Sequence, residues 1–159
     1  MANEIKVGIA DYKIACNPDK LITIGLGSCV GIAIYDKTSK VGGLSHIMLP
    51  DSTLFTRDIK IEKFADLAIT KMVEELYKFN SRKLVAKIAG GASMFNFPDK
   101  KMISDIGNRN VMAVEKKLQE LNIPILGKHT GGNMGRTMIV ELEKFQVNIR
   151  TANRDVITL

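Results

Sequence analysis

Alternating apolar and polar positions, together with short apolar runs that end in turn residues, predict a series of short strands. The predicted strands span residues 5–9, 21–25, 30–36, 41–49 and 83–89. The segment 13–16 either continues the first of them or pairs back on it. Ile125 and Leu126, which follow Pro124, predict a further strand. The sequence is therefore rich in short strands, as expected of a sheet protein.

The C-terminal part of the chain has the most regular alternation. Its apolar residues fall at every second position in two sets, which are Met138, Val140 and Leu142, followed by Phe145, Val147 and Ile149. Strict alternation of this kind is typical of antiparallel strands with one face buried.

Two segments have helical periodicity instead. Residues 59–79 carry an apolar stripe at three- and four-residue spacing, made up of Ile61, Phe64, Ala68, Met72 and Leu76. Residues 111–121 form a second predicted helix, for which Asn110 is the expected N-cap. No linker or repeat divides the chain, so the sequence predicts a single α+β domain over residues 1–159. Its sheet should be mixed and largely antiparallel, with two helices covering it.

Composition and charge exclude some classes of partner. The 159 residues carry a formal net charge of +6, but Lys and Arg are scattered among acids, with no aromatic platform between them. This pattern disfavours nucleic-acid binding and favours an encounter with an acidic protein surface. The first residues contain no apolar signal segment, and no apolar run is long enough to cross a bilayer. We therefore expect a cytoplasmic protein with reduced thiols and no membrane insertion.

The segment around Cys29 combines the residues needed for attack on an acyl carbon. Cys29 lies in a predicted turn between two strands, framed by Gly25, Gly27 and Gly31, and His46 lies on the next predicted strand. An imidazole can remove the proton of a nearby thiol and later protonate the leaving group. Gly27 is expected to allow the turn, and backbone N–H groups of residues 27–29, including Gly27 and Ser28, can stabilise an oxyanion.

A third group should orient the imidazole of His46 and select its tautomer. Thr23, on the strand that enters the turn, is the best-placed candidate, through its hydroxyl or its carbonyl group. Ser45 and Ser28 are weaker candidates for the same role.

Other interpretations of these residues remain open at this point. A free cysteine in an apolar segment is often only a small buried hydrophobic residue. A zinc site would have to use Cys16, Cys29, His46 and His129, and their spacing is unlike that of structural zinc sites. We expect no metal and no cofactor, a structural role for Cys16, and a loop position for His129.

Six sequence blocks together resemble the CheD family of chemoreceptor glutamine deamidases. They are TIGLGSCVGIAIYD, GGLSHIMLP, KFADLAI, KIAGGASMF, IGNRNV and GGNMGR, and they extend from about residue 5 to residue 142. The resemblance implies a protein-glutamine glutaminase that converts glutamines of methyl-accepting chemoreceptors to glutamate. It places the nucleophile on Cys29, the base on His46 and the orienting residue on Thr23.

The resemblance also implies a fold and a partner. It implies a β-sandwich-like core flanked by helices, similar to the deamidating toxins of the cytotoxic necrotizing factor type. It further implies binding to the chemotaxis phosphatase CheC. A non-catalytic adaptor or regulator of that phosphatase is the main alternative, and a cysteine protease is a third. The adaptor would keep partner binding after Cys29→Ala, whereas the deamidase would lose ammonia release.

Overall fold

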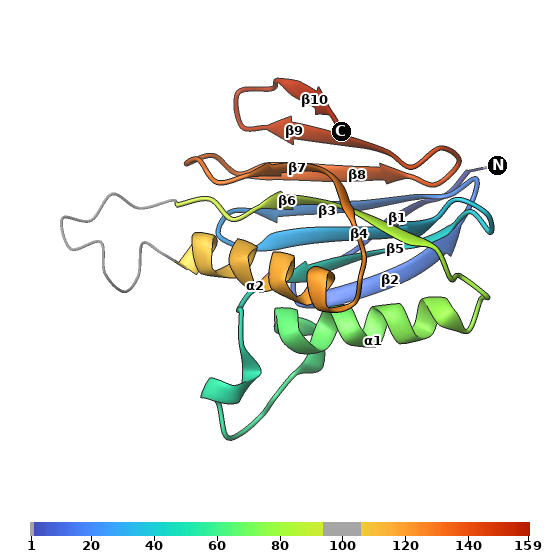
Figure 1. The fold of residues 1–159 in the computed structure, drawn as a ribbon. Helices are drawn as coiled ribbons and strands as arrows, with labels where there is room; N and C mark the ends of the chain where they lie inside the picture. Colours follow the sequence, from blue (N-terminus) through green and yellow to red (C-terminus); the bar gives the residue numbers. More distant parts are fainter. Residues whose placement is uncertain (1, 94–105) are drawn as a thin grey trace.

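The computed structural model describes residues 2–93 and 106–159, whose strands form two five-stranded sheets with two helices on one side (Figure 1). The first sheet, here called the β3 sheet, has the order β1-β3-β8-β9-β10. Its strands are β1 (Glu4–Lys6), β3 (Lys20–Leu26), β8 (Arg136–Glu141), β9 (Gln146–Thr151) and β10 (Val156–Thr158). All neighbours in it are antiparallel except β1 and β3.

The second sheet, here called the β4 sheet, has the order β2-β5-β4-β6-β7. Its strands are β2 (Asp11–Cys16), β5 (Val41–Ile47), β4 (Val30–Asp36), β6 (Leu84–Gly90) and β7 (Ile125–Thr130). Only β6 and β7 pair in parallel. The predicted mixed, largely antiparallel α+β fold is therefore confirmed. The segment 13–16 belongs to β2 and pairs with β5 rather than with the first strand.

The two sheets share an apolar core because alternate residues of β4 point to opposite faces of their sheet. Ala33 and Tyr35 pack against the β3 sheet, where they meet Leu21, Met138 and Val140. Tyr35 also stacks on Phe145, with ring centroids 4.7 Å apart. Burial of this interface excludes water from most of the space between the sheets.

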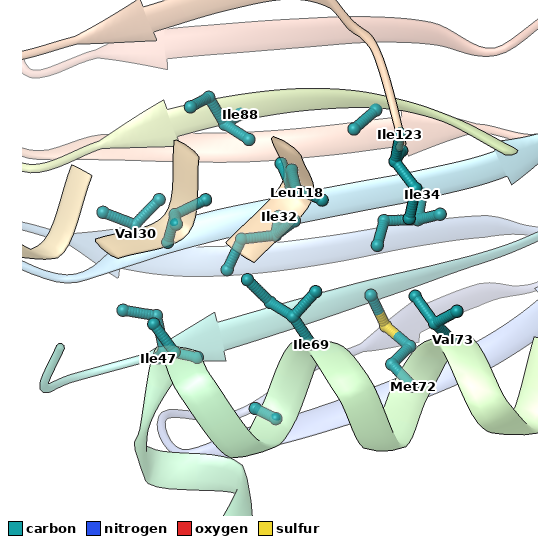
Figure 2. Close-up of a cluster of buried hydrophobic side chains, with 14 of the residues drawn as sticks. Val30, Ile32, Ile34, Ile47, Ile69, Met72, Val73, Ile88, Leu118 and Ile123 are labelled. Carbon is teal, nitrogen blue, oxygen red and sulfur yellow. The ribbon is translucent and has the colours of Figure 1, made fainter. Parts of the chain in front are cut away.

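The opposite face of β4 packs against both helices. Helix α1 (Ala65–Tyr77) directs Ile69, Met72 and Val73 towards the sheet, as Figure 2 shows. Helix α2 (Ile106–Glu120) contributes Val114 and Leu118 to the same cluster. The β4 sheet is thus the middle layer, with the β3 sheet on one face and the helices on the other.

The first helix is shorter than the periodicity predicts. The stretch 59–64 contains only a 3₁₀ turn, Ile61–Lys63, and Ile61 is exposed. Phe64 is extended and forms a bridge with Leu49, and the N–H of Leu49 donates to the carbonyl of Lys63. This pairing holds the segment in a non-helical conformation, so the predicted start at residue 59 is wrong.

The second helix begins before the predicted cap. Asn110 is the fifth residue of α2 and is buried, so it is not an N-cap. Gly107 packs so closely on the segment after β6 that an added Cβ would lie 2.4 Å from the carbonyl oxygen of Ala92. Met94 and Phe95 of the KIAGGASMF block lie outside the described residues. Among the helices that the structure describes, none is long and apolar enough to span a membrane.

Candidate active site

Cys29 lies where the chain passes from one sheet to the other. Strand β3 ends at Leu26 in the β3 sheet, and β4 begins at Val30 in the β4 sheet. The register of β3 with β8 shifts between Thr23 and Leu26, and Gly25 there has a φ of 81°. This bulge, rather than Gly27, requires the left-handed conformation. Gly27 itself is not among the glycines with a positive φ.

A single hairpin brings His46 next to the strand that follows Cys29, as predicted. In the antiparallel pair of β4 and β5, His46 lies opposite Gly31. A Cβ on Gly31 would point at Met138, Leu26 and Thr23. The side chain of His46, which lies opposite Gly31, therefore points into the space between the two sheets. Cys29 is two residues before Gly31 and packs against the same inter-sheet core. Cys29 and His46 are therefore diagonal neighbours on one face, with no side chain at Gly31 between them.

Thr23 reaches His46 from the opposite sheet. Its hydroxyl oxygen lies 2.7 Å from Nδ1 of His46 and donates to the carbonyl of Val7 at 2.8 Å. A threonine hydroxyl has one hydrogen, so a hydroxyl that donates to Val7 must accept from Nδ1. This arrangement places the imidazole proton on Nδ1 and leaves the lone pair on Nε2, which is buried and has no hydrogen-bond partner in residues 2–93 and 106–159.

Burial keeps both the thiol and the imidazole neutral. His46 is fully buried, and desolvation lowers the pKa of its imidazole to about 4. Cys29 is partly buried, and desolvation raises the pKa of its thiol, although its own backbone N–H acts in the opposite direction. At neutral pH the two groups are therefore a thiol and a neutral imidazole, not a thiolate and an imidazolium.

The carbonyl groups of the turn are all held by hydrogen bonds. Those of Gly27 and Cys29 accept from the backbone N–H groups of Ala92 and Gly91, each at 2.8 Å. The carbonyl of Ser28 accepts from the side chain of Asn110 at 3.0 Å. On the donor side, the N–H of Gly27 donates to the carbonyl of Gly25 at 3.1 Å. The backbone N–H groups of Ser28 and Cys29 donate to no other backbone group in the described part of the chain.

Asn110 is the residue of this site that the sequence interpretation missed. Its Nδ2 donates both to Ser28 and to the carbonyl of Met48, the latter at 2.9 Å. Its side chain thereby links the residue before Cys29 to the end of the strand that carries His46. The IGNRNV block, which helped to define the family resemblance, was the signal that could have indicated a role beyond capping.

The weaker orienting candidates lie elsewhere. Ser45 pairs with Ile32 and so lies on the face of the β4 sheet that packs against the helices, opposite to His46. Ser28 contributes its carbonyl to the Asn110 contact, and no hydrogen bond joins its side chain to His46 in the described structure.

Cys16 and His129 lie away from this site. Cys16 pairs with Val41, at the opposite end of β5 from His46, and is exposed. His129 lies within β7 rather than in the predicted loop, because its backbone pairs in parallel with Ala89 of β6. Three strand spacings, about 14 Å, separate the backbones of His129 and His46 in one row of the sheet. The four zinc-ligand candidates therefore do not converge.

Burial also affects His129, whose environment differs from that of His46. Desolvation and the positive charge of Arg136 lower the pKa of its imidazole. Arg136 is itself buried, and the N–H groups of its Nη2 donate to the carbonyl of Gly131. Over residues 2–93 and 106–159, no group of three or more His, Cys, Asp or Glu side chains is arranged to hold a metal ion.

Comparison with known proteins agrees with the resemblance. The family model described as "CheD chemotactic sensory transduction" matches residues 48–151. A "Probable chemoreceptor glutamine deamidase CheD" of Clostridium botulinum strain Hall is 60% identical over 150 residues, which are 93% of this chain and 93% of that protein. The chain belongs to the CheD family.

A second relative extends the match almost to both ends. The protein of the same name from Clostridium novyi strain NT is 57% identical over 156 residues, which are 97% of this chain and 96% of that protein. The stretch that matches the CheD model begins after Cys29 and His46. The CheD assignment therefore does not depend on the thiol and imidazole described above.

Proposed function

We propose that this chain hydrolyses the side-chain amide of selected glutamines on methyl-accepting chemoreceptors, releasing ammonia and leaving glutamate. The names of the relatives from both Clostridium species support the substrate class. The observation that carries the chemistry is the hydrogen bond between Thr23 and Nδ1 of His46, because it leaves an uncharged Nε2 as the base on the inter-sheet face that also holds Cys29.

In the proposed first half-reaction, Nε2 of His46 takes the proton of Cys29 while the sulfur attacks the amide carbon of the glutamine. The carbonyl oxygen of the substrate becomes an oxyanion, and the N–H groups of Ser28 and Cys29, which donate to no other backbone group in the described part of the chain, are the proposed donors to it. Gly27 contributes the small turn that admits the substrate. Collapse of the intermediate breaks the carbon–nitrogen bond, and His46 returns the proton to the leaving ammonia.

In the second half-reaction, water attacks the thioester. His46 removes a proton from this water, the carbon–sulfur bond breaks, and the proton passes to the departing sulfur. The net change converts one amide and one water to one carboxylic acid and one ammonia, which restores Cys29. This chemistry uses no metal ion or organic cofactor.

The finer family expectations belong to the same proposal. We propose that the chain acts in the cytoplasm as one domain and binds the phosphatase CheC, and that its catalytic fold is shared with deamidating toxins of the cytotoxic necrotizing factor type. The alternative, an adaptor for CheC without catalysis, makes a different prediction for the thiol. Binding that survives Cys29→Ala, in a protein that releases no ammonia even as wild type, would favour the adaptor.

The test is to incubate the protein with a chemoreceptor cytoplasmic fragment and map conversion of glutamine to glutamate by mass spectrometry. We expect Cys29→Ala to abolish conversion without unfolding the protein. Cys16→Ala is the matched control, since Cys16 is exposed at the other end of the sheet, and should retain wild-type activity. Conversion by a folded Cys29→Ala protein at the wild-type rate would refute the proposal.

A further inference from the structure

We propose that Asn110 is a positioning residue for the reaction: its side-chain amide orients the peptide between Ser28 and Cys29 so that the N–H of Cys29 is presented to the oxyanion. The inference rests on the proposed function and adds a residue to it. Asn110 touches neither of the reacting side chains. It acts through the backbone carbonyls of Ser28, next to Cys29, and of Met48, two residues after His46.

The contacts of Asn110 use the full donor capacity of its amide. Nδ2 has two hydrogens, and the structure gives it two acceptors, the carbonyl oxygens of Ser28 at 3.0 Å and Met48 at 2.9 Å. Because both partners are carbonyl oxygens, only the NH₂ group can face them, and the orientation of the amide is determined. The side chain is fully buried, so water does not compete for these bonds.

The bond to Ser28 decides the direction of the next N–H group. A peptide unit is planar and trans, so its carbonyl and its N–H point in opposite directions. When the carbonyl of Ser28 faces Asn110, the N–H of Cys29 therefore faces away from helix α2. That N–H donates to no other backbone group among the described residues, and its one interaction there is with the sulfur of its own residue. A substrate oxyanion held at that sulfur would therefore lie next to it.

The neighbouring peptide units do not depend on Asn110. The carbonyls of Gly27 and Cys29 are held by the backbone N–H groups of Ala92 and Gly91. Within the turn, loss of the asparagine amide would thus release only the middle peptide, and the turn would stay attached on both sides. This selectivity separates a positioning role from a general role in holding the fold together.

The second bond couples the same amide to the strand of the base. Met48 lies two residues after His46, where the chain leaves β5. Helix α2 is a firm support for this link, because Gly107 packs against the segment after β6 with no room for a side chain. One side chain of α2 therefore sets the distance between the turn of Cys29 and the end of the strand that carries His46.

The experiment compares Asn110→Ala and Asn110→Ser with Asn108→Ala, a control on an exposed position of the same helix. For each folded variant, kcat and KM on a receptor fragment are measured beside the rate at which iodoacetamide alkylates Cys29. Alkylation uses the thiol but forms no oxyanion. Its rate therefore measures the reactivity of the Cys29 thiol and does not depend on the oxyanion donor that Asn110 is proposed to orient.

We expect Asn110→Ala to lower kcat by about 100-fold, the effect of losing one oxyanion donor, with KM and alkylation within about threefold of wild type. Asn110→Ser, which keeps one donor, should recover part of kcat, and Asn108→Ala should match wild type. If Asn110→Ala does not fold, Asn110→Ser supplies the same comparison. Unchanged kcat, or equal loss of kcat and alkylation, would overturn this inference. An inactive wild-type protein would refute the proposed function itself.

Discussion

The hydroxyl of Thr23 and Nδ1 of His46 lie 2.7 Å apart although they belong to different sheets. The same hydroxyl donates its one hydrogen to the carbonyl of Val7, so it can only accept from Nδ1. The imidazole proton of His46 is therefore on Nδ1. The packing of the two sheets thus determines the tautomer of His46. Activity should accordingly depend on each group that maintains this contact.

Replacement of Thr23 tests the hydroxyl directly. Thr23→Val keeps the shape of the side chain but leaves Nδ1 of His46 and the carbonyl of Val7 without a partner, whereas Thr23→Ser retains the hydroxyl. We expect Thr23→Val to lower kcat by about 100-fold and the free energy of unfolding by about 1–3 kcal/mol. Thr23→Ser should retain most activity. Equal activity of the two variants in a deamidation assay would exclude a role for the hydroxyl.

Gly31 lies opposite His46 and two residues after Cys29, on the face between the sheets, and has no side chain there. An added Cβ would lie 2.7 Å from the sulfur of Met138 and 3.2 Å from a methyl group of Leu26. We expect Gly31→Ala to displace these side chains, to cost about 1–3 kcal/mol of stability, and to reduce activity at 25 °C by more than tenfold in the protein that remains folded. Gly135→Ala is the matched control, since no atom lies within 4 Å of its added Cβ. An active, stable Gly31→Ala protein would show that the site tolerates a side chain at position 31.

The neutral resting pair predicts how the thiol reacts with an alkylating reagent. With the pKa of Cys29 raised and that of His46 lowered, little thiolate is present at neutral pH. We expect iodoacetamide to modify Cys29 no faster than the exposed Cys16 at pH 7, and the rate at Cys29 to increase steadily towards high pH. Peptide mapping of both sites in one sample provides the measurement. A fast, pH-independent reaction of Cys29 down to pH 5 would indicate a preformed ion pair instead.

Burial of neutral His46 also predicts the pH dependence of stability. Its pKa falls from 6.5 in the unfolded chain to about 4 in the folded protein, so between these values the unfolded chain binds the extra proton. Stability is therefore complete above about pH 6.5 and declines as the pH falls towards 4, by at most about 3 kcal/mol from this residue. Urea unfolding at several pH values should show the decline in wild type.

The matched variants for this prediction are His46→Gln and His129→Gln. His46→Gln should remove most of the loss between pH 6.5 and 5, where few carboxyl groups titrate. His129→Gln should remove less, because His129 is only partly buried. An unaltered pH dependence in His46→Gln would show that the histidine is not buried in the neutral form.

Local features of the sequence predicted the elements that local forces determine. The strands at 30–36 and 41–49 and the hairpin that joins them follow from their apolar runs and the polar turn between them. The position of His46 beside the strand that follows Cys29 comes from the same hairpin. The pair of C-terminal strands follows from strict alternation, which one-sided burial produces. For the same reason Thr23 could be proposed as the orienting residue from its place on the strand before the turn.

Features that depend on distant pairing could not be predicted. No local signal shows that β3 and β4 belong to different sheets, since both are ordinary apolar runs. His129 stands beside glycines, yet parallel pairing with β6 makes it part of a strand. Asn110 is of a residue type that is common at helix N-caps. Only the packing of α2 against the turn of Cys29 reveals its two carbonyl partners. Strand β10 has only three residues, which are too few to show an alternation.

The covalent intermediate offers the most direct measurement of the central claim, that Cys29 attacks a receptor glutamine. The protein is mixed with a receptor cytoplasmic fragment, quenched in acid within the first turnovers, digested and examined by mass spectrometry. The account predicts a receptor peptide joined through its former glutamine to Cys29 as a thioester, which disappears in Cys29→Ala and persists in Cys16→Ala. Glutamate that accumulates on the receptor without any adduct at Cys29, and equally in Cys29→Ala, would contradict it.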